Sequence, residues 1–366
     1  MKKINVLVVD DSAFMRKLIM DFLSEDPQIN VVGTARNGED GIKKLKELKP
    51  DVITMDVEMP VLNGMEALKI IMKQHPVPVV MLSSTTKEGT ENTIAAIQYG
   101  AIDFIAKPSG AISLDLHKIK EDLIRKVISA SKVNRKQLVE LATDKYLSTT
   151  QDNNYSKIEL KEASPLLKIH PNKRNDATQR IICIGTSTGG PRALQNVLTK
   201  LPANLDAGVL IVQHMPAGFT KSLAARLNTL CSISVKEASD GEVVQKGTAY
   251  IAPGGFHMRT KQIGANIVIN LDQTEARNGH RPAVDVLFES VSEIKHYMKV
   301  AVIMTGMGSD GSKGLVALKN NGSVIAIAES QATSIVFGMP KAAIATKLVD
   351  EVQDVENIAK TILKYV

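Results

Sequence analysis

Tryptophan is absent from this chain of 366 residues, cysteine occurs only twice, and aromatic side chains make up 4% of the composition. The net charge of +6 comes from basic residues that are spread along the chain without interleaved aromatic stacking platforms, so we expect no nucleic-acid partner. Two cysteines are too few for a disulfide framework or a cysteine-based metal site. Because Cys183 lies within an apolar run, we expect a buried thiol in a reducing compartment.

Long apolar segments are also missing, since no run approaches the roughly 20 residues that a helix needs to span a bilayer. The N-terminal run from Ile4 to Val9 is too short for the apolar region of a signal peptide and leads directly into two aspartates. We therefore expect a soluble, cytoplasmic, monomeric protein without direct membrane insertion. The length is sufficient for two domains, each with a core of its own.

Between residues 4 and 126, short β-branched runs alternate five times with amphipathic stretches. The runs are apolar throughout, which is typical of strands that are buried on both faces of a parallel sheet. Right-handed crossovers between such strands produce an open, doubly wound sheet with its ligand site at the carboxyl ends of the strands. The expected strands are Val6 to Val9, Val31 to Ala35, Val52 to Met55, Val79 to Leu82 and Ile102 to Ala106.

A linker is expected between residues 127 and 179, where the periodicity fades into polar stretches, although Val133 to Leu147 could continue the preceding helix. From 180 to 366 the βα alternation resumes and predicts a second doubly wound α/β domain. Its middle, Gly241 to Leu271, contains short strands and Gly/Pro turns typical of an antiparallel hairpin or a sheet edge. The other expected elements are strands 181–184, 209–212, 300–304 and 324–328, a helix from Pro191, helices 221–230, 282–294 and 313–319, and a last helix that ends in Lys364-Tyr365-Val366.

Polar side chains stand at the strand ends of the first half. Asp10 and Asp11 follow the first predicted strand and Asp56 follows the third, so the three carboxylates converge if those strands are neighbours. Two unit charges about 4 Å apart at an effective dielectric constant near 20 cost about 4 kcal/mol, which calls for a cation. Mg²⁺ suits a set of oxygen ligands. With Lys107 at the end of the fifth strand, Asp56 becomes a candidate nucleophile toward a phosphoryl group.

Taken one at a time, these residues can be explained by ordinary structural roles, and only their combination supports a phosphoryl-accepting site. Asp11-Ser12 is a good helix N-cap without any phosphoryl chemistry. Ser83 ends the fourth strand, where its hydroxyl could bond an acyl phosphate, and Phe104 is expected to face an outer surface. A possible cis peptide bond at Lys107-Pro108 would fix the direction of the lysine.

With these residues at these spacings, the first 126 residues resemble the receiver domain of bacterial two-component response regulators. The resemblance implies that Asp56 is the phosphoacceptor, that a histidine kinase is the phosphodonor, and that Asp10 and Asp11 bind Mg²⁺ together with Asp56. Phenylalanine, where some receivers have tyrosine, keeps the aromatic ring without its hydroxyl. The switch residues that the resemblance implies are Ser83, Phe104 and Lys107.

The second half contains a different motif, Gly185-Thr186-Ser187-Thr188-Gly189, between a predicted strand and a helix led by Pro191. This is the context of a G-x-S-x-G nucleophile turn. At a helix N-terminus the dipole and the free backbone N–H groups favour the negative charge of a nucleophile or an oxyanion. A glycine-rich turn after a strand can equally hold a phosphate group, so the motif needs a base to indicate a hydrolase.

His214 follows the next strand at the same rim and is placed to take the proton of Ser187. Asp310, after the strand 300–304, can orient the imidazole, although a helix N-cap or an Asx turn would also explain it. Met307, between two glycines, offers a backbone N–H to an oxyanion. The sequence leaves open the roles of His257, His280, Arg281, Pro282 and Asp285, and the histidines expected to be structural are His75, His117, His170 and His296.

The second half resembles the catalytic domain of chemotaxis protein-glutamate methylesterases over essentially its whole length. The resemblance implies that Ser187 is the nucleophile, His214 the base and Asp310 the orienting carboxylate, and that the ester step needs no metal. Thr186 departs from the family, which often has alanine there, and this concerns the packing of the turn. The distinctive runs are Ser-Thr-Gly-Gly-Pro (187–191), Gln-His-Met-Pro (213–216), Arg-Pro-Ala-Val-Asp-Val-Leu-Phe (281–288) and Thr-Gly-Met-Gly-Ser-Asp-Gly (305–311).

Together, the two resemblances imply a phosphorylation-activated esterase. It would hydrolyse glutamate γ-methyl esters on cytoplasmic chemoreceptor helices, release methanol, and deamidate particular receptor glutamines. The unphosphorylated receiver is expected to pack over the esterase rim, and phosphorylation of Asp56 to weaken that interface. Two alternatives remain, a phosphorylation-gated esterase for a small soluble ester and a non-enzymatic response regulator. The absence of a helix-turn-helix pattern argues against DNA binding.

Overall fold

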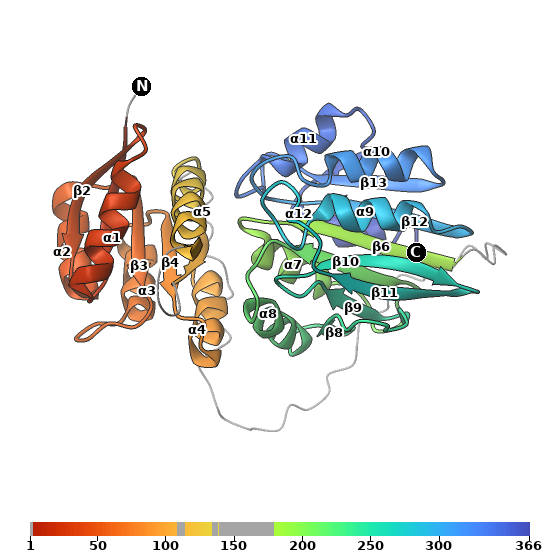
Figure 1. Ribbon diagram of the computed structural model, residues 1–366, viewed down its shortest axis with the longest axis horizontal. Helices are drawn as coiled ribbons and strands as arrows, with labels where there is room; N and C mark the ends of the chain where they lie inside the picture. Colours follow the sequence, from red (N-terminus) through yellow and green to blue (C-terminus); the bar gives the residue numbers. More distant parts are fainter. Residues whose placement is uncertain (1–2, 108–113, 134–137, 139–178) are drawn as a thin grey trace, which may run out of the picture.

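The computed structural model describes residues 3–107, 114–133, 138 and 179–366 (Figure 1). The expected cis bond at Pro108 and most of the segment from Val133 to Leu147 lie outside these residues. Within the described part of the chain, no helix has the length and apolar character needed to cross a membrane.

The first half is a five-stranded parallel sheet, as the sequence predicts, and its strand order is β2-β1-β3-β4-β5. The strands β1, β3, β4 and β5 are largely buried on both faces, which explains their continuous apolar runs, whereas the edge strand β2 is mostly half-buried. Four of the helices begin at side-chain caps, Ser12, Asn37, Asn63 and Thr86, each of which accepts a backbone N–H of the first turn. The elements are β1 (Ile4–Val9), α1 (Ala13–Ser24), β2 (Ile29–Ala35), α2 (Gly38–Leu48), β3 (Val52–Asp56), α3 (Gly64–Gln74), β4 (Val79–Ser83), α4 (Lys87–Gln98), β5 (Asp103–Ala106) and α5 (Leu114–Ala130).

The second half is built on a seven-stranded parallel sheet in the order β14-β13-β12-β6-β7-β9-β8. The strand β6 lies between β12 and β7, so the segments that follow these three strands share one edge. Its elements are β6 (Gln179–Thr186), α7 (Gly190–Leu198), β7 (Gly208–Gln213), α8 (Phe219–Asn228), β8 (Ser234–Glu237), β9 (Thr248–Ile251), α9 (Val284–Ser292), β12 (Tyr297–Ile303), α10 (Ser312–Asn320), β13 (Val324–Glu329), α11 (Met339–Ala345), β14 (Glu351–Gln353) and α12 (Val355–Ile362).

The middle of the second half agrees only in part with the expectation. An antiparallel hairpin of β10 (His257–Ile263) and β11 (Asn266–Asp272) is present, as predicted. In contrast, β9 belongs to the main sheet, where it pairs in parallel with β7 and β8. The short run Thr248–Ile251 is largely buried and lies between β7 and β8 in the main sheet. The last helix ends at Ile362 and not at the final residues.

The two halves pack against each other through α4, α5 and the end of β5 on one side and α8 and the strand ends on the other (Figure 1). Phe104 is 2% exposed and stacks on Phe219, with the ring centroids 4.4 Å apart. The expectation that Phe104 faces an outer surface is therefore wrong for the whole chain. Its ring lies on the face of the first half that the second half covers, which a pattern within the first 126 residues cannot reveal.

Candidate functional site

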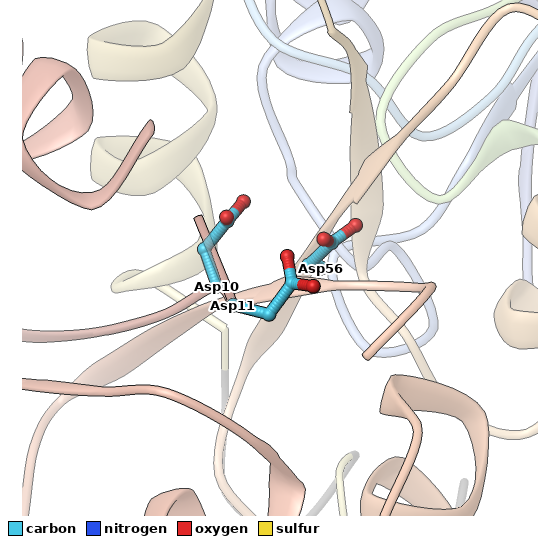
Figure 2. Close-up of side chains that lie close together, drawn as sticks. All are labelled: Asp10, Asp11 and Asp56. Atoms are coloured by element: carbon cyan, nitrogen blue, oxygen red, sulfur yellow. The ribbon is translucent and has the colours of Figure 1, made fainter. Parts of the chain in front are cut away.

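The three predicted carboxylates converge at one edge of the first sheet. Because β1 and β3 are adjacent and parallel, Asp10, Asp11 and Asp56 emerge at the same end, and one oxygen of each lies within 4.8 Å of the others (Figure 2). Asp10 and Asp56 are buried, whereas Asp11 is exposed. A cluster of hard oxygen donors that is open on one side fits Mg²⁺, since this ion keeps several waters and binds one or two carboxylates.

Lys107 lies at the same edge. Its Nζ is 2.6 Å from Oδ2 of Asp56 and 3.0 Å from Oδ2 of Asp10. Burial raises the pKa of Asp56 to about 6, although the hydrogen bond and the charge of Lys107 oppose this shift. Burial would lower the pKa of Lys107, but Asp56 and Asp10 outweigh it and the pKa is raised. The lysine therefore remains a cation beside the candidate acceptor.

Ser83 is fully buried at the end of β4, and its hydroxyl donates to the carbonyl of Gly89 at 2.9 Å. The hydroxyl must rotate away from this carbonyl before it can bond a phosphoryl oxygen. Ser12 accepts the N–H of Met15, so the helix-cap explanation of Asp11-Ser12 holds in addition to the carboxylate cluster.

The second site lies where β6, β7 and β12 end. Ser187 is in the turn between β6 and α7, two residues before the N-cap Gly189, which has a φ of 78° that suits glycine. His214 directly follows β7. Its Nε2 lies 2.8 Å from Oδ2 of Asp310, which follows β12 in the chain. Side chains far apart in sequence thus meet at adjacent strand ends, as the parallel topology requires.

Asp310 is oriented by a neighbouring helix. Its oxygens accept the backbone N–H groups of Val284 at 2.6 Å and Asp285 at 2.9 Å, at the start of α9. Asp285 in turn accepts the N–H groups of Gly311 and Gly314 at the start of α10. Asp310 therefore accepts from the start of α9, and Asp285 accepts from the start of α10, which Asp310 precedes; at both positions the helix dipole stabilises a negative charge. The sequence anticipated a local cap by Asp310 but not this exchange.

The electrostatic environment keeps Asp310 ionised. Burial alone would raise its pKa, but the hydrogen bond and the charge of His214, together with the two backbone N–H groups, lower the pKa to about 2. For Asp285, burial prevails and the pKa is raised. A carboxylate that stays charged beside an imidazole holds the ring and stabilises its protonated form.

Ser187, His214 and Met307 line a cavity of about 810 Å³ that also includes residues of the first half, among them Lys107 and Arg125. The Nδ1 atom of His214 is buried without a hydrogen-bond partner. Ser187 and His214 line the same cavity, but no hydrogen bond joins their side chains in the described residues. In enzymes without bound substrate, catalytic hydrogen bonds are often long or poorly aligned, and they tighten only in the substrate complex.

His280, which the sequence left open, belongs to this cavity. Its ring stacks on His214 with centroids 3.9 Å apart, and its Nε2 lies 2.9 Å from Nη1 of Arg125 in α5. Burial, followed by the charges of His214 and Arg125, lowers the pKa of His280 to about 2, so the ring is neutral. His257, the other open histidine, is the first residue of β10, and its Nε2 donates to the carbonyl of Glu275 at 3.0 Å.

The residues next to Ser187 have specific partners. Thr186, the departure noted in the sequence, donates its hydroxyl to Oε1 of Gln213 at 2.6 Å, which ties β6 to β7. Thr188 donates to Oδ2 of Asp103 in the first half at 2.7 Å. The hydroxyl of Ser129 in α5 lies 2.8 Å from the sulfur of Met307. Neither cross-domain contact is visible in a local sequence pattern.

Comparisons with known proteins agree with this architecture. Residues 182–362 match the family model "CheB methylesterase", and residues 6–117 match "Response regulator receiver domain". A protein-glutamate methylesterase/protein-glutamine glutaminase of Halalkalibacterium halodurans is 56% identical over 99% of this chain and 98% of its own length. The corresponding protein of Bacillus subtilis is 51% identical over 98% of this chain and 97% of its own.

Among solved structures, the CheB methylesterase catalytic domain of Thermotoga maritima is similar at 43% sequence identity and a TM-score of 0.50, and it covers 52% of this chain and 100% of its own. The chain belongs to the CheB family of protein-glutamate methylesterases/protein-glutamine glutaminases that carry an N-terminal receiver domain.

Proposed function

We propose that this protein removes methyl groups from glutamate γ-methyl esters on the cytoplasmic helices of chemoreceptors, and that phosphorylation of its receiver domain activates the reaction. It also deamidates receptor glutamines at the same site. The observation that carries the proposal is the 2.8 Å contact between His214 and Asp310 at the cavity that Ser187 lines. We further propose a cytoplasmic monomer with domains at 1–126 and 180–366, joined by a linker at 127–179.

In the first chemical step, Ser187 Oγ attacks the ester carbonyl while His214 takes its proton. The Nδ1 of His214 is the nitrogen that Asp310 leaves available. The tetrahedral intermediate then expels methoxide, which receives the proton from His214 and leaves as methanol. A glutamine substrate follows the same course with ammonia as the leaving group.

In the second step a water molecule gives a proton to His214 and attacks the acyl-enzyme, which releases the glutamate carboxylate and regenerates the serine hydroxyl. The backbone N–H of Met307 is the proposed donor to the oxyanion in both steps. Asp310 keeps the imidazole in one tautomer and stabilises its positive charge. None of these steps draws on a metal.

We propose Asp56 as the acceptor of a phosphoryl group from a chemotaxis histidine kinase. Asp10, Asp11 and Asp56 would hold Mg²⁺, which would supply charge neutralisation for the transferred phosphoryl group. Lys107 is close enough to Asp56 to bind a phosphoryl oxygen. Ser83 would then leave the carbonyl of Gly89 to bond the phosphoryl group, and Phe104 would respond through its packing on Phe219.

The regulatory part of the proposal rests on the cavity. Residues of β5 and α5 form one side of it, so the first half would restrict the approach of a bulky receptor helix to Ser187 while the halves are packed together. Activation would require only that the phosphorylated receiver bind this surface more weakly. The contacts to be released include Thr188 with Asp103 and His280 with Arg125.

The test measures methanol release from methyl-labelled chemoreceptor membranes, with and without acetyl phosphate and Mg²⁺. We expect stimulation by the donor, no release above background with Ser187→Ala, and an unstimulated basal rate with Asp56→Asn. Undiminished release by Ser187→Ala would remove the serine mechanism. Donor stimulation of Asp56→Asn would remove Asp56 as the acceptor.

A further inference from the structure

We propose that Glu329 is a positioning residue for the reaction at Ser187, because its buried carboxylate holds the segment Thr305 to Met307 against the nucleophile turn. The inference rests on the proposed role of Ser187. Glu329 is the last residue of β13, is not among the residues that line the cavity, and has no hydrogen bond to Ser187 in the described part of the chain. Its effect must therefore pass through another residue, and the hydrogen bonds identify that residue as Thr305.

The carboxylate of Glu329 is 1% exposed and forms no salt bridge within the described residues. Its Oε2 accepts the backbone N–H of Thr305 at 2.7 Å, and its Oε1 accepts the hydroxyl of Thr333 at 3.0 Å. The charges of Glu356 and Asp354 act on it as well, and because both are acids they do not compensate its charge. Burying a carboxylate without a cation costs folding free energy unless hydrogen bonds compensate it. The backbone N–H of Thr305 provides one of these hydrogen bonds.

Thr305 connects this carboxylate to the nucleophile turn. Its carbonyl accepts the N–H of Ser187 at 3.0 Å, and its hydroxyl donates to the carbonyl of Thr188 at 2.9 Å. The same hydroxyl accepts the N–H of Val336 at 2.9 Å. The residue that Glu329 holds by its backbone nitrogen thus holds Ser187 and Thr188 in turn.

Gly306, which follows Thr305, is packed closely against Ser187 and Met339. A Cβ atom on Gly306 would lie 2.7 Å from Cβ of Ser187 and 2.4 Å from the sulfur of Met339, so there is no room for a side chain between this backbone and the serine. Met307, the proposed oxyanion donor, follows directly. A shift at Thr305 would therefore move the nucleophile and the oxyanion donor relative to each other, and displacements of about 1 Å can cost about 100-fold in rate.

Conservative replacements separate positioning from general stability. In Glu329→Gln, the amide oxygen can accept from Thr305 and the amide nitrogen can donate to Thr333, so the geometry is kept without a charge. In Glu329→Ala, the buried N–H of Thr305 has no acceptor. In Glu329→Asp, the carboxylate is kept but withdrawn by one methylene. Ser290→Ala is the matched control, because it removes a side-chain acceptor from the buried N–H of Thr260 at a site that contacts neither Ser187 nor Thr305.

The experiment uses the full chain with acetyl phosphate and Mg²⁺. It measures the rate at which a fluorophosphonate probe labels Ser187, and kcat and KM for methanol release from methylated receptor membranes. For Glu329→Ala we expect both the labelling rate and kcat to fall by about tenfold or more, with KM changed by less than about threefold. Glu329→Gln should stay within about threefold of the parent, and Ser290→Ala within about twofold.

If Glu329→Ala does not fold, Glu329→Asp takes its place with the same expected loss. The inference is overturned if the alanine or aspartate variant keeps more than about half of the parental labelling rate, or if the glutamine variant is as impaired as they are. An equal loss in Ser290→Ala would also overturn it, since the effect would then be general. Labelling or turnover by Ser187→Ala would instead refute the proposed function, which keeps the two failures distinct.

Discussion

The guanidinium of Arg125 lies 2.9 Å from the imidazole of His280, measured from Nη1 to Nε2. This contact joins α5 of the receiver to the ring that stacks on His214. Because an arginine donates only, Nε2 of His280 accepts and the ring is neutral with its proton on Nδ1. The receiver therefore fixes the tautomer of a ring in direct contact with the proposed catalytic base, in addition to covering the cavity.

Removal of this contact should release part of the inhibition. We expect Arg125→Ala to raise the basal methanol release of unphosphorylated protein by up to about tenfold, since a hydrogen bond to a charged group contributes roughly 1.5 kcal/mol. The matched control is Arg226→Ala, which removes an exposed cross-domain bond to Gln98 at 3.2 Å away from the cavity. An equal rise in both variants would mean that the cavity contact has no special role.

The stacked pair Phe104 and Phe219 should behave as one unit. Each single alanine variant is expected to raise the ratio of basal to donor-stimulated activity, and the double variant to add little to either. Aromatic pairs contribute about 0.5–1.5 kcal/mol beyond burial, so the coupling is large enough to measure. The measurement is a double-mutant cycle on the basal rate, and strict additivity would exclude a direct coupling between the rings.

Loss of the charge on Asp310 should lower turnover more than stability. Asp310→Asn keeps a single acceptor oxygen, so it can accept from the backbone N–H of Val284 or of Asp285 but not from both, and it no longer stabilises a protonated His214. We expect kcat to fall by about three to four orders of magnitude while the labelled receptor binds with a similar KM. The thermal midpoint of the second domain serves as the folding control. A kcat within about tenfold of the parent would contradict the proposed role.

Glu329 should also leave a signature in the pH dependence of stability. Burial raises its pKa from the ordinary value of 4.5 to about 7, so between these pH values the folded state binds a proton that the unfolded state has lost. Its contribution to stability is therefore present at low pH and is lost as the pH rises through this window. Each pKa unit corresponds to about 1.4 kcal/mol.

Glu329→Gln lacks this titration. Its thermal midpoint for the second domain, followed by calorimetry of the full chain, should rise relative to the parent between about pH 5 and pH 8. The difference between variant and parent should be constant above about pH 8. A difference that does not change with pH would show that Glu329 titrates at an ordinary value.

Several elements of the fold were predictable because their signals are local. The buried strands of both sheets are continuous apolar runs, and the polar residues that follow them, such as Asp56, Ser187 and His214, mark the strand ends. The helix cap at Ser12 and the positive φ at Gly189 also depend on local sequence, because the residue type at each position favours that conformation. Once parallel strands are expected, convergence of their carboxyl ends follows from geometry.

Other features depend on contacts between distant segments. Asp310 is oriented by the first turn of α9, Phe104 is covered by α8, and β9 pairs with β7 although its sequence suggests a sheet edge. No local period or turn residue encodes which face another domain will cover.

The sequence by itself therefore determined the strand and helix pattern, the two kinds of polar strand ends and the family. The tertiary structure alone decided that His280 stacks on the base, that Arg125 reaches it, and that Glu329 supports the nucleophile turn. The physical reason is that hydrophobic periodicity specifies which side of an element is buried, whereas the partner on that side depends on how the whole chain packs.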